Sequence, residues 1–301
     1  MTSDLPPRPT LPSRPELPEG VQRDDLEVET TAAHDDLPPW PFWLPLAALA
    51  MTLTVALVAL IGFSALSQMA GQELAGNRRP WQVIVASGIT QQLAMIAASL
   101  AFARAAAGRV SLADFGIRRT ALLPAIGWTL ATWFTFLLFT AAYATALGIE
   151  NVTDEMPERL GANQSIVAAV AVTFMATVMA PVAEELFFRG FFFTAVRRLA
   201  GVVGGAVATG ILFGLVHFGS DPRFLVPLGV FGALLCLLYW KTGSLIPCMA
   251  LHALNNSIAV GRSLEWHGTA IVATMLASTL TIIGVSILLS RTRPVATPAR
   301  T

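Results

Sequence analysis

The chain carries little charge for its length, and almost none of that charge is lysine. Only 13% of the 301 residues are charged, and Lys241 is the single lysine. A soluble domain usually has about 25% charged residues. Because a helix needs roughly 20 apolar residues to cross a bilayer, long uncharged stretches exclude a soluble protein and predict an all-α, polytopic membrane protein. Such stretches occupy 37–72, 80–103, 120–149, 160–183, 199–220, 224–240 and 266–290.

Cysteine and basic patches are also scarce. The two cysteines, Cys236 and Cys248, fall in apolar stretches, where buried hydrophobic side chains are expected rather than a disulfide or a metal site. No basic patch with interleaved aromatic residues is present, so nucleic acid is not an expected partner. The first apolar stretch follows an acidic, proline-rich segment, which is the wrong layout for a cleaved signal peptide. We therefore expect that stretch to be a transmembrane helix.

The chain divides into a tail, a transmembrane domain and a short end. Residues 1–39 are rich in proline and acidic residues, a composition that cannot bury enough apolar surface to fold. They predict a disordered cytoplasmic tail, either a solvated extension or a partner-binding segment. Residues 40–291 are expected to form the transmembrane domain, and 292–301 a short C-terminal tail. About eight transmembrane helices are predicted, near 41–66, 81–103, 121–147, 164–183, 201–218, 224–240, 245–261 and 269–290.

The basic residues predict an orientation in the membrane. Cytoplasmic loops carry more arginine and lysine than loops on the other side. With the N-terminus in the cytoplasm, the inner side receives Arg23, Arg104, Arg109, Arg118, Arg119, Arg197, Arg198, Lys241, Arg291 and Arg293. The outer side receives only Arg78, Arg79, Arg159, Arg223 and Arg262. We therefore expect a multi-pass protein of the plasma membrane, with both termini in the cytoplasm and the lipid bilayer as its surroundings.

Polar residues within the apolar region are few and concentrated. Ionisable groups at membrane depth cost roughly 2.5–3.5 kcal/mol each on insertion scales, so they usually mark function. Glu185 and Arg189 are four residues apart and can pair on one helix face. The adjacent Glu184 points about 100° away from them. The residues concerned are Glu184, Glu185, Arg189, His217, His252 and Asn256.

These side chains have the chemistry of a water-activating site. Three apolar stretches each contribute polar groups that lipid would reject unless the groups met one another. Glu184 can accept the proton of a water, and His217 and His252 can orient that water or donate to a leaving amine. The Asn256 amide can stabilise a developing oxyanion.

The spacing of these residues resembles the three motifs of the CPBP intramembrane protease family, which includes CAAX prenyl proteases and bacteriocin-processing enzymes. The motifs occur in the family's order, each with its own apolar stretch, over roughly residues 160–260. They read Glu184-Glu185-x-x-x-Arg189, Phe213-x-x-x-His217 and His252-x-x-x-Asn256.

The resemblance implies an intramembrane endopeptidase that acts on a peptide or a membrane-protein substrate. In it, Glu184 would be the general base, His217 and His252 would hold the water and the intermediate, and Asn256 would serve the oxyanion. The second glutamate of the first motif and its arginine, Glu185 and Arg189, would support the site.

Other interpretations of the same residues stay open. Glu184, His217 and His252 could ligate zinc with an open fourth position, as in a metalloprotease, although we expect no obligatory metal or other cofactor. The fold could also be a non-catalytic membrane scaffold or a bacteriocin-immunity protein with structural motif residues. A third alternative is a cofactor binder that uses both histidines. A transporter is disfavoured, because no paired inverted repeat accompanies the polar cluster.

Overall fold

The computed structural model describes residues 38–71, 79–149 and 155–290. Within these ranges the regular structure is helical and contains no strand, as predicted. Nearly all of the predicted tail, residues 1–37, and the C-terminal segment 292–301 lie outside the described residues. The tail's disorder and the domain boundaries therefore stay predictions.

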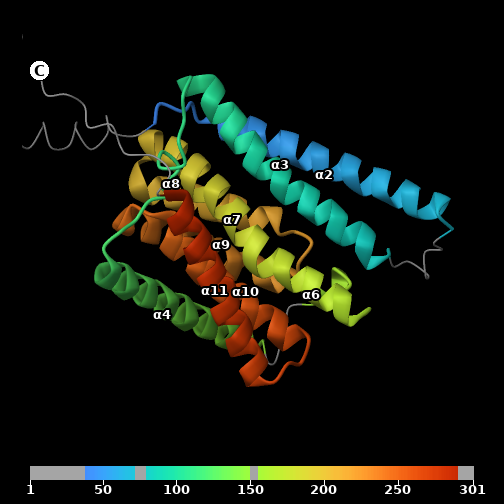
Figure 1. Cartoon of the computed structure of the whole chain (residues 1–301). Helices are drawn as coiled ribbons and strands as arrows, with labels where there is room; N and C mark the ends of the chain where they lie inside the picture. Colours follow the sequence, from blue (N-terminus) through green and yellow to red (C-terminus); the bar gives the residue numbers. More distant parts are fainter. Residues whose placement is uncertain (1–37, 72–78, 150–154, 291–301) are drawn as a thin grey trace, which may run out of the picture. The chain divides into compact units, whose positions relative to one another are not determined.

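The described residues form long helices that pack side by side (Figure 1). The separate helices are α2 (Trp43–Met69), α3 (Trp81–Ala107), α4 (Leu122–Ala146), the short α5 (Met156–Arg159), α9 (Pro222–Thr242), α10 (Leu245–Ser263) and α11 (Gly268–Ser290). One continuous helical run contains two π-helical segments, η1 and η2. It comprises α6 (Ile166–Phe174), η1 (Met175–Met179), α7 (Ala180–Glu185), η2 (Leu186–Phe193) and α8 (Thr194–Val216).

Six helical runs in the described part of the chain are long and apolar enough to cross a membrane. This makes the protein a polytopic membrane protein, whereas the sequence predicted about eight spans. The difference has two causes. The run from Ile166 to Val216 counts once, although the chain departs from helical geometry at Gly201. In addition, α10 is less apolar than the other long helices, because it carries polar residues of the candidate site.

The predicted end of the fourth helix near residue 183 is wrong. The helical run continues through Glu184, Glu185 and Arg189 and changes direction only at Gly201. A cluster of charges suggested a helix end beside the apolar stretch. The charges instead lie within the helix, because they bond to one another and to groups on neighbouring helices.

Phenylalanines of η2 anchor this run in the protein core. Phe187, Phe188, Phe191 and Phe193 are fully buried. Phe191 meets the ring of Trp40 edge-on, with ring centroids 5.1 Å apart. Because these side chains pack on several helices at once, they fix the rotation of the helix that carries the first motif.

Glycines let α8 and α9 approach closely, which fixes the end of α8. A Cβ atom on Gly210 would lie 2.5 Å from the carbonyl oxygen of Gly229, and one on Gly214 would lie 2.7 Å from that of Leu225. Small residues at such positions allow helix backbones to touch in membranes. The two cysteines expected to be buried, Cys236 and Cys248, are buried free thiols.

Candidate active site

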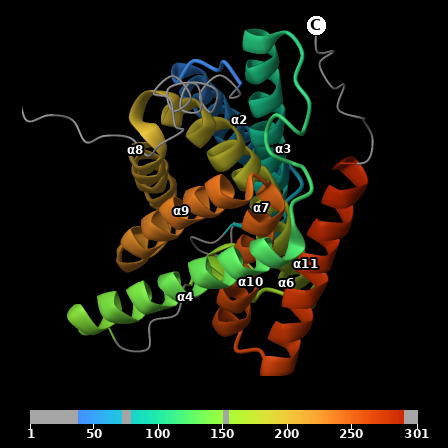
Figure 2. The same ribbon diagram turned by 90° about the vertical axis from the view of Figure 1, so that its left-hand side faces the viewer.

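A reversal of the chain at Gly201 sets the first two motifs at one depth. Gly201 has φ +68°, which favours glycine. Just after it, a Cβ atom on Gly205 would lie 3.0 Å from the Cα atom of Arg197, so the chain returns against itself. Glu184 precedes Gly201 by 17 residues and His217 follows it by 16. At 1.5 Å per residue both arms, which run through α7 and α8 (Figure 2), are about 25 Å long. Their ends meet, because His217 Nε2 lies 4.0 Å from Glu184 Oε2.

The helix α10 brings the third motif to the same depth. It begins beside η2, where a Cβ atom on Gly190 would lie 3.3 Å from Leu245. Glu184 precedes Gly190 by six residues, and His252 follows Leu245 by seven residues. Both paths are about 10 Å long in a helix. The two side chains therefore lie level with each other.

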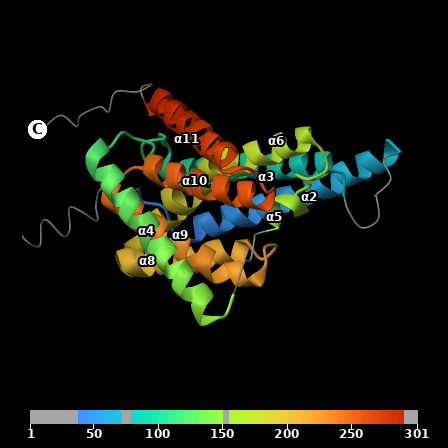
Figure 3. The ribbon, with the colours of Figure 1, turned by 90° about the horizontal axis from the view of Figure 1, so that it is seen from below.

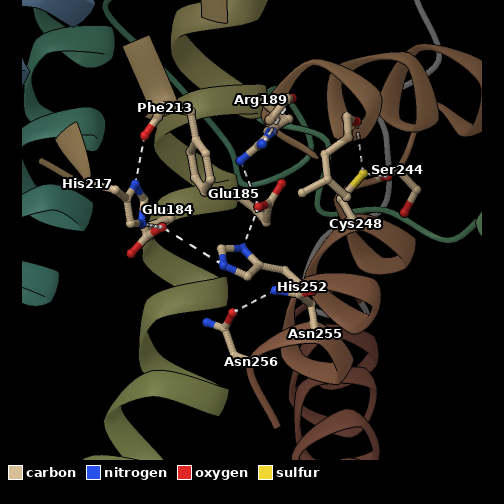
Figure 4. A network of polar contacts seen from close by, with 12 residues as sticks. Glu184, Glu185, Arg189, Phe213, His217, Ser244, Cys248, His252, Asn255 and Asn256 are labelled. Carbon is tan, nitrogen blue, oxygen red and sulfur yellow. Dashed lines mark hydrogen bonds and ion pairs between the residues drawn. The ribbon is translucent and has the colours of Figure 1, made fainter. Parts of the chain in front are cut away.

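Glu185, Arg189 and His252 form a buried hydrogen-bonded network (Figure 4). Arg189 Nη1 donates to Glu185 Oε1 at 2.8 Å, which confirms the predicted pairing. Arg189 Nη2 donates to the carbonyl oxygen of Gly232 at 3.0 Å. His252 Nδ1 donates to the same Glu185 oxygen at 2.7 Å. Glu185 and Arg189 are both 0% exposed, so the carboxylate and the guanidinium compensate each other's charge inside the protein.

Both histidine rings are oriented with Nε2 towards Glu184. His217 Nδ1 lies 2.7 Å from the carbonyl oxygen of Phe213. Since a carbonyl oxygen only accepts, this nitrogen carries the hydrogen. The contact of His252 Nδ1 with the Glu185 carboxylate fixes the same tautomer. In the neutral rings, each Nε2 is therefore an acceptor, and each lies 4.0 Å from Glu184 Oε2.

The spacing around Glu184 suits a water molecule. Glu184 Oε2 is a buried oxygen to which no described residue gives a hydrogen bond, and 4.0 Å is too long for a direct bond to either ring. One water about 2.8 Å from the oxygen and from a ring nitrogen would bridge them.

Zinc fits this arrangement less well. Tetrahedral zinc with ligands at about 2.0–2.1 Å needs those ligands only about 3.4 Å apart. The carboxylate oxygen would have to move roughly 0.6 Å closer to each ring to reach that separation. Among the described residues, no group of three His, Cys, Asp or Glu side chains is arranged to hold a metal ion. The donor types alone are compatible with zinc.

Asn256 donates to the backbone of the neighbouring helical run. Its Nδ2 lies 2.9 Å from the carbonyl oxygen of Ala176 in η1. In an α-helix this carbonyl would accept from Ala180, but the Ala180 N–H bonds to Met175 instead. Five residues after Ala176 stands Pro181, which has no N–H. The asparagine amide thus replaces a backbone donor that the π-helical turn and the proline remove.

Residues 166–258 match a family model described as Rce1-like, type II CAAX prenyl endopeptidase Rce1-like. We call residues 166–258 the Rce1-like segment because of this similarity. The predicted resemblance to the CPBP and CAAX protease family is confirmed over these residues, and the Rce1-like segment contains all six predicted site residues. The match indicates a peptide hydrolase with a CAAX-type intramembrane protease fold. No curated protein and no solved structure gives a significant match to the chain.

The Rce1-like segment also uses residues that the sequence analysis did not single out. Pro181 was a visible signal, because a proline within an apolar helix usually marks a local change in hydrogen bonding. Gly201 could have been read as a turn between two helical stretches. The carbonyl groups of Ala176 and Gly232 carry no signal in the sequence, since every residue has one.

Proposed function

We propose that this protein is an intramembrane endopeptidase that hydrolyses a peptide bond with a water molecule activated by Glu184. One observation carries the proposal: a single buried carboxylate oxygen lies 4.0 Å from the Nε2 atoms of both His217 and His252. The Rce1-like match supports peptide hydrolysis as the reaction class. The substrate class is a peptide or a membrane-protein segment that reaches the site within the bilayer.

The proposed reaction begins with a water between Glu184 and the two rings. Glu184 removes one proton from the water as the oxygen attacks the carbonyl carbon of the substrate. A ring nitrogen accepts a hydrogen bond from the second O–H of the water, whose hydrogen stays on the oxygen, and so fixes the direction of attack. The tetrahedral intermediate then collapses, and Glu184 returns its proton to the leaving amine. Atoms balance, because the water is divided between the new carboxylate and the new amine.

The Asn256 amide is placed to stabilise the oxyanion of the intermediate. The Asn256 amide has two N–H groups and gives one to Ala176, so the second can serve the oxyanion. The Glu185 carboxylate accepts from His252 Nδ1 and so fixes the direction of the His252 ring. Arg189 holds that carboxylate in place and is a supporting residue.

We propose that no metal ion is obligatory, on the grounds of the wide spacing described above. If zinc does bind, Glu184, His217 and His252 would hold it, and it would lower the pKa of a bound water. The deciding measurement is the metal content of the purified active protein, together with its activity after treatment with a chelator. Activity that is lost with the metal and restored by zinc would overturn this part of the proposal.

The main test compares the wild type with Glu184→Gln and His217→Ala at matched expression. Comparative peptidomics of membranes with and without active Glu184 identifies the substrate. Loss of a general base typically costs 10²–10⁴-fold in rate, so cleavage by Glu184→Gln should fall by about that factor. Glu158→Gln is the matched control, because Glu158 is an exposed acidic residue outside the site. Unchanged cleavage by Glu184→Gln would reject the mechanism.

The same variants distinguish the alternative functions. A scaffold or a bacteriocin-immunity protein would keep partner binding or protection in Glu184→Gln, and no substrate would accumulate. A cofactor binder that uses both histidines would show an absorbance band in the purified wild type that His217→Ala removes.

A further inference from the structure

A separate cavity is lined by residues of α4, α10 and α11. Figure 3 shows where these three helices lie in the bundle. Its volume is about 560 Å³. Ala250 lines it and precedes His252 by two residues, which is about 200° around a helix. The cavity and the candidate active site therefore lie on opposite faces of α10. Most of its lining consists of apolar side chains of α4, α10 and α11, such as Ala125, Pro247 and Ile287.

One end of this cavity is positively charged. Arg119 is the only charged residue in its lining. The Arg119 side chain is exposed, and the ion pairs of the described residues give it no acidic partner. Two more cations lie near the turn between α9 and α10: Arg118 donates to the carbonyl oxygen of Gly243, and Lys241 lies 4.9 Å from the Trp128 ring centroid.

The rest of the cavity offers almost nothing to a polar ligand. It runs from the ends of α4, α10 and α11 that lie near Arg119 towards Leu130 and Ala250, deeper in the bundle. The other polar residues of its lining are two threonines whose hydroxyls are already bonded: Thr120 donates to the carbonyl oxygen of Thr242, and Thr129 donates to that of Ala125. A ligand that fits must therefore be apolar over most of its length and anionic at one end.

We propose that this cavity binds an anionic phospholipid, with one acyl chain against α10 and the phosphate at Arg119. The bilayer around the protein supplies such molecules. Arg pairs well with phosphate oxygens, and basic pockets between transmembrane helices are suited to lipid head groups. A bound chain packs against Pro247 and Ala250, on the helix that carries His252. Anionic lipid is thus expected to stabilise the folded bundle.

The test is lipid retention by the purified full chain, measured by native mass spectrometry. The protein is taken from vesicles of phosphatidylcholine alone or mixed with phosphatidylglycerol. We expect retained phosphatidylglycerol in wild type and about fivefold weaker retention in Arg119→Gln, which corresponds to about 1 kcal/mol. Arg109→Gln is the matched control, since Arg109 is an exposed arginine that does not line the cavity. It should retain the lipid as wild type does.

A second variant tests the acyl-chain part of the proposal separately. Ala125 is 7% exposed and lines the cavity, so Ala125→Phe fills it without touching the charge. That variant should also lose the lipid, and added phosphatidylglycerol should raise the melting temperature of wild type only. The proposal would be overturned if Arg119→Gln retained as much phosphatidylglycerol as wild type does. It would also be overturned if wild type retained as much phosphatidylcholine as phosphatidylglycerol. A prenylated peptide that displaces the lipid from the cavity would overturn it as well. None of these readouts depends on protease activity.

Discussion

The bond from Asn256 to Ala176 leads to a prediction about stability. Asn256→Ala removes the donor that replaces the backbone N–H missing at Pro181. The bond is partly buried, and a carbonyl left unsatisfied away from water costs about 1–3 kcal/mol, so we expect a loss at the lower end of that range in the free energy of unfolding. Pro181→Ala returns an N–H to the helix. In that background, Asn256→Ala should cost less than about 0.5 kcal/mol, because the Ala176 carbonyl can regain a backbone donor.

The four proteins of this cycle can be compared by unfolding in detergent, followed by tryptophan fluorescence. Thr173→Ala is a suitable control. Its hydroxyl donates to the carbonyl oxygen of Ala169 within the same helix. Thr173→Ala should therefore change the free energy of unfolding equally in the wild type and in Pro181→Ala. A loss from Asn256→Ala that is the same with and without Pro181 would refute the reasoning. The asparagine would then serve the oxyanion alone.

Three further changes have expected outcomes. Arg189→Ala leaves its carboxylate partner buried and unpaired and should cost about 3–5 kcal/mol of unfolding free energy. Gly210→Ala places a methyl group 2.5 Å from the Gly229 carbonyl oxygen and should cost about 1–3 kcal/mol, whereas Gly62→Ala, with open space around it, should not. Hydrogen bonds from Arg223 lower the pKa of Asp221 to about 2. The stability from this pair is complete above pH 3.8 and is lost as the pH falls through about 2. Asp221→Asn should therefore leave the pH profile of cleavage unchanged above pH 5, which a pH series would measure.

Much of the candidate site could be predicted because it depends on spacing along helices. The four-residue interval from Glu185 to Arg189 indicated a pair on one face, and the pair is present. The convergence of Glu184 with His217 and His252 was expected from the cost of isolated polar groups in lipid, and both Nε2 atoms lie 4.0 Å from Glu184 Oε2.

The parts that could not be predicted depend on backbone groups and on compensation between charges. The sequence suggested a helix end near Glu184, because a cluster of charges interrupts the hydropathy. The run continues since Glu185 is neutralised by Arg189 and bonded to His252. The partner of Asn256 was not predictable either. It exists only because a π-helical turn and Pro181 leave one carbonyl without a donor.

The reversal at Gly201 divides the chain between the first two motifs into two helical arms of nearly equal length. A single residue inserted into one arm would shift its end by about 1.5 Å and rotate it by about 100°. Glu184 and His217 would then face different neighbours, although every residue of the site would still be present. The interval between the two motifs is thus as much a part of the site as the side chains themselves, and sequence changes that preserve the motifs but alter this length should abolish the shared pocket.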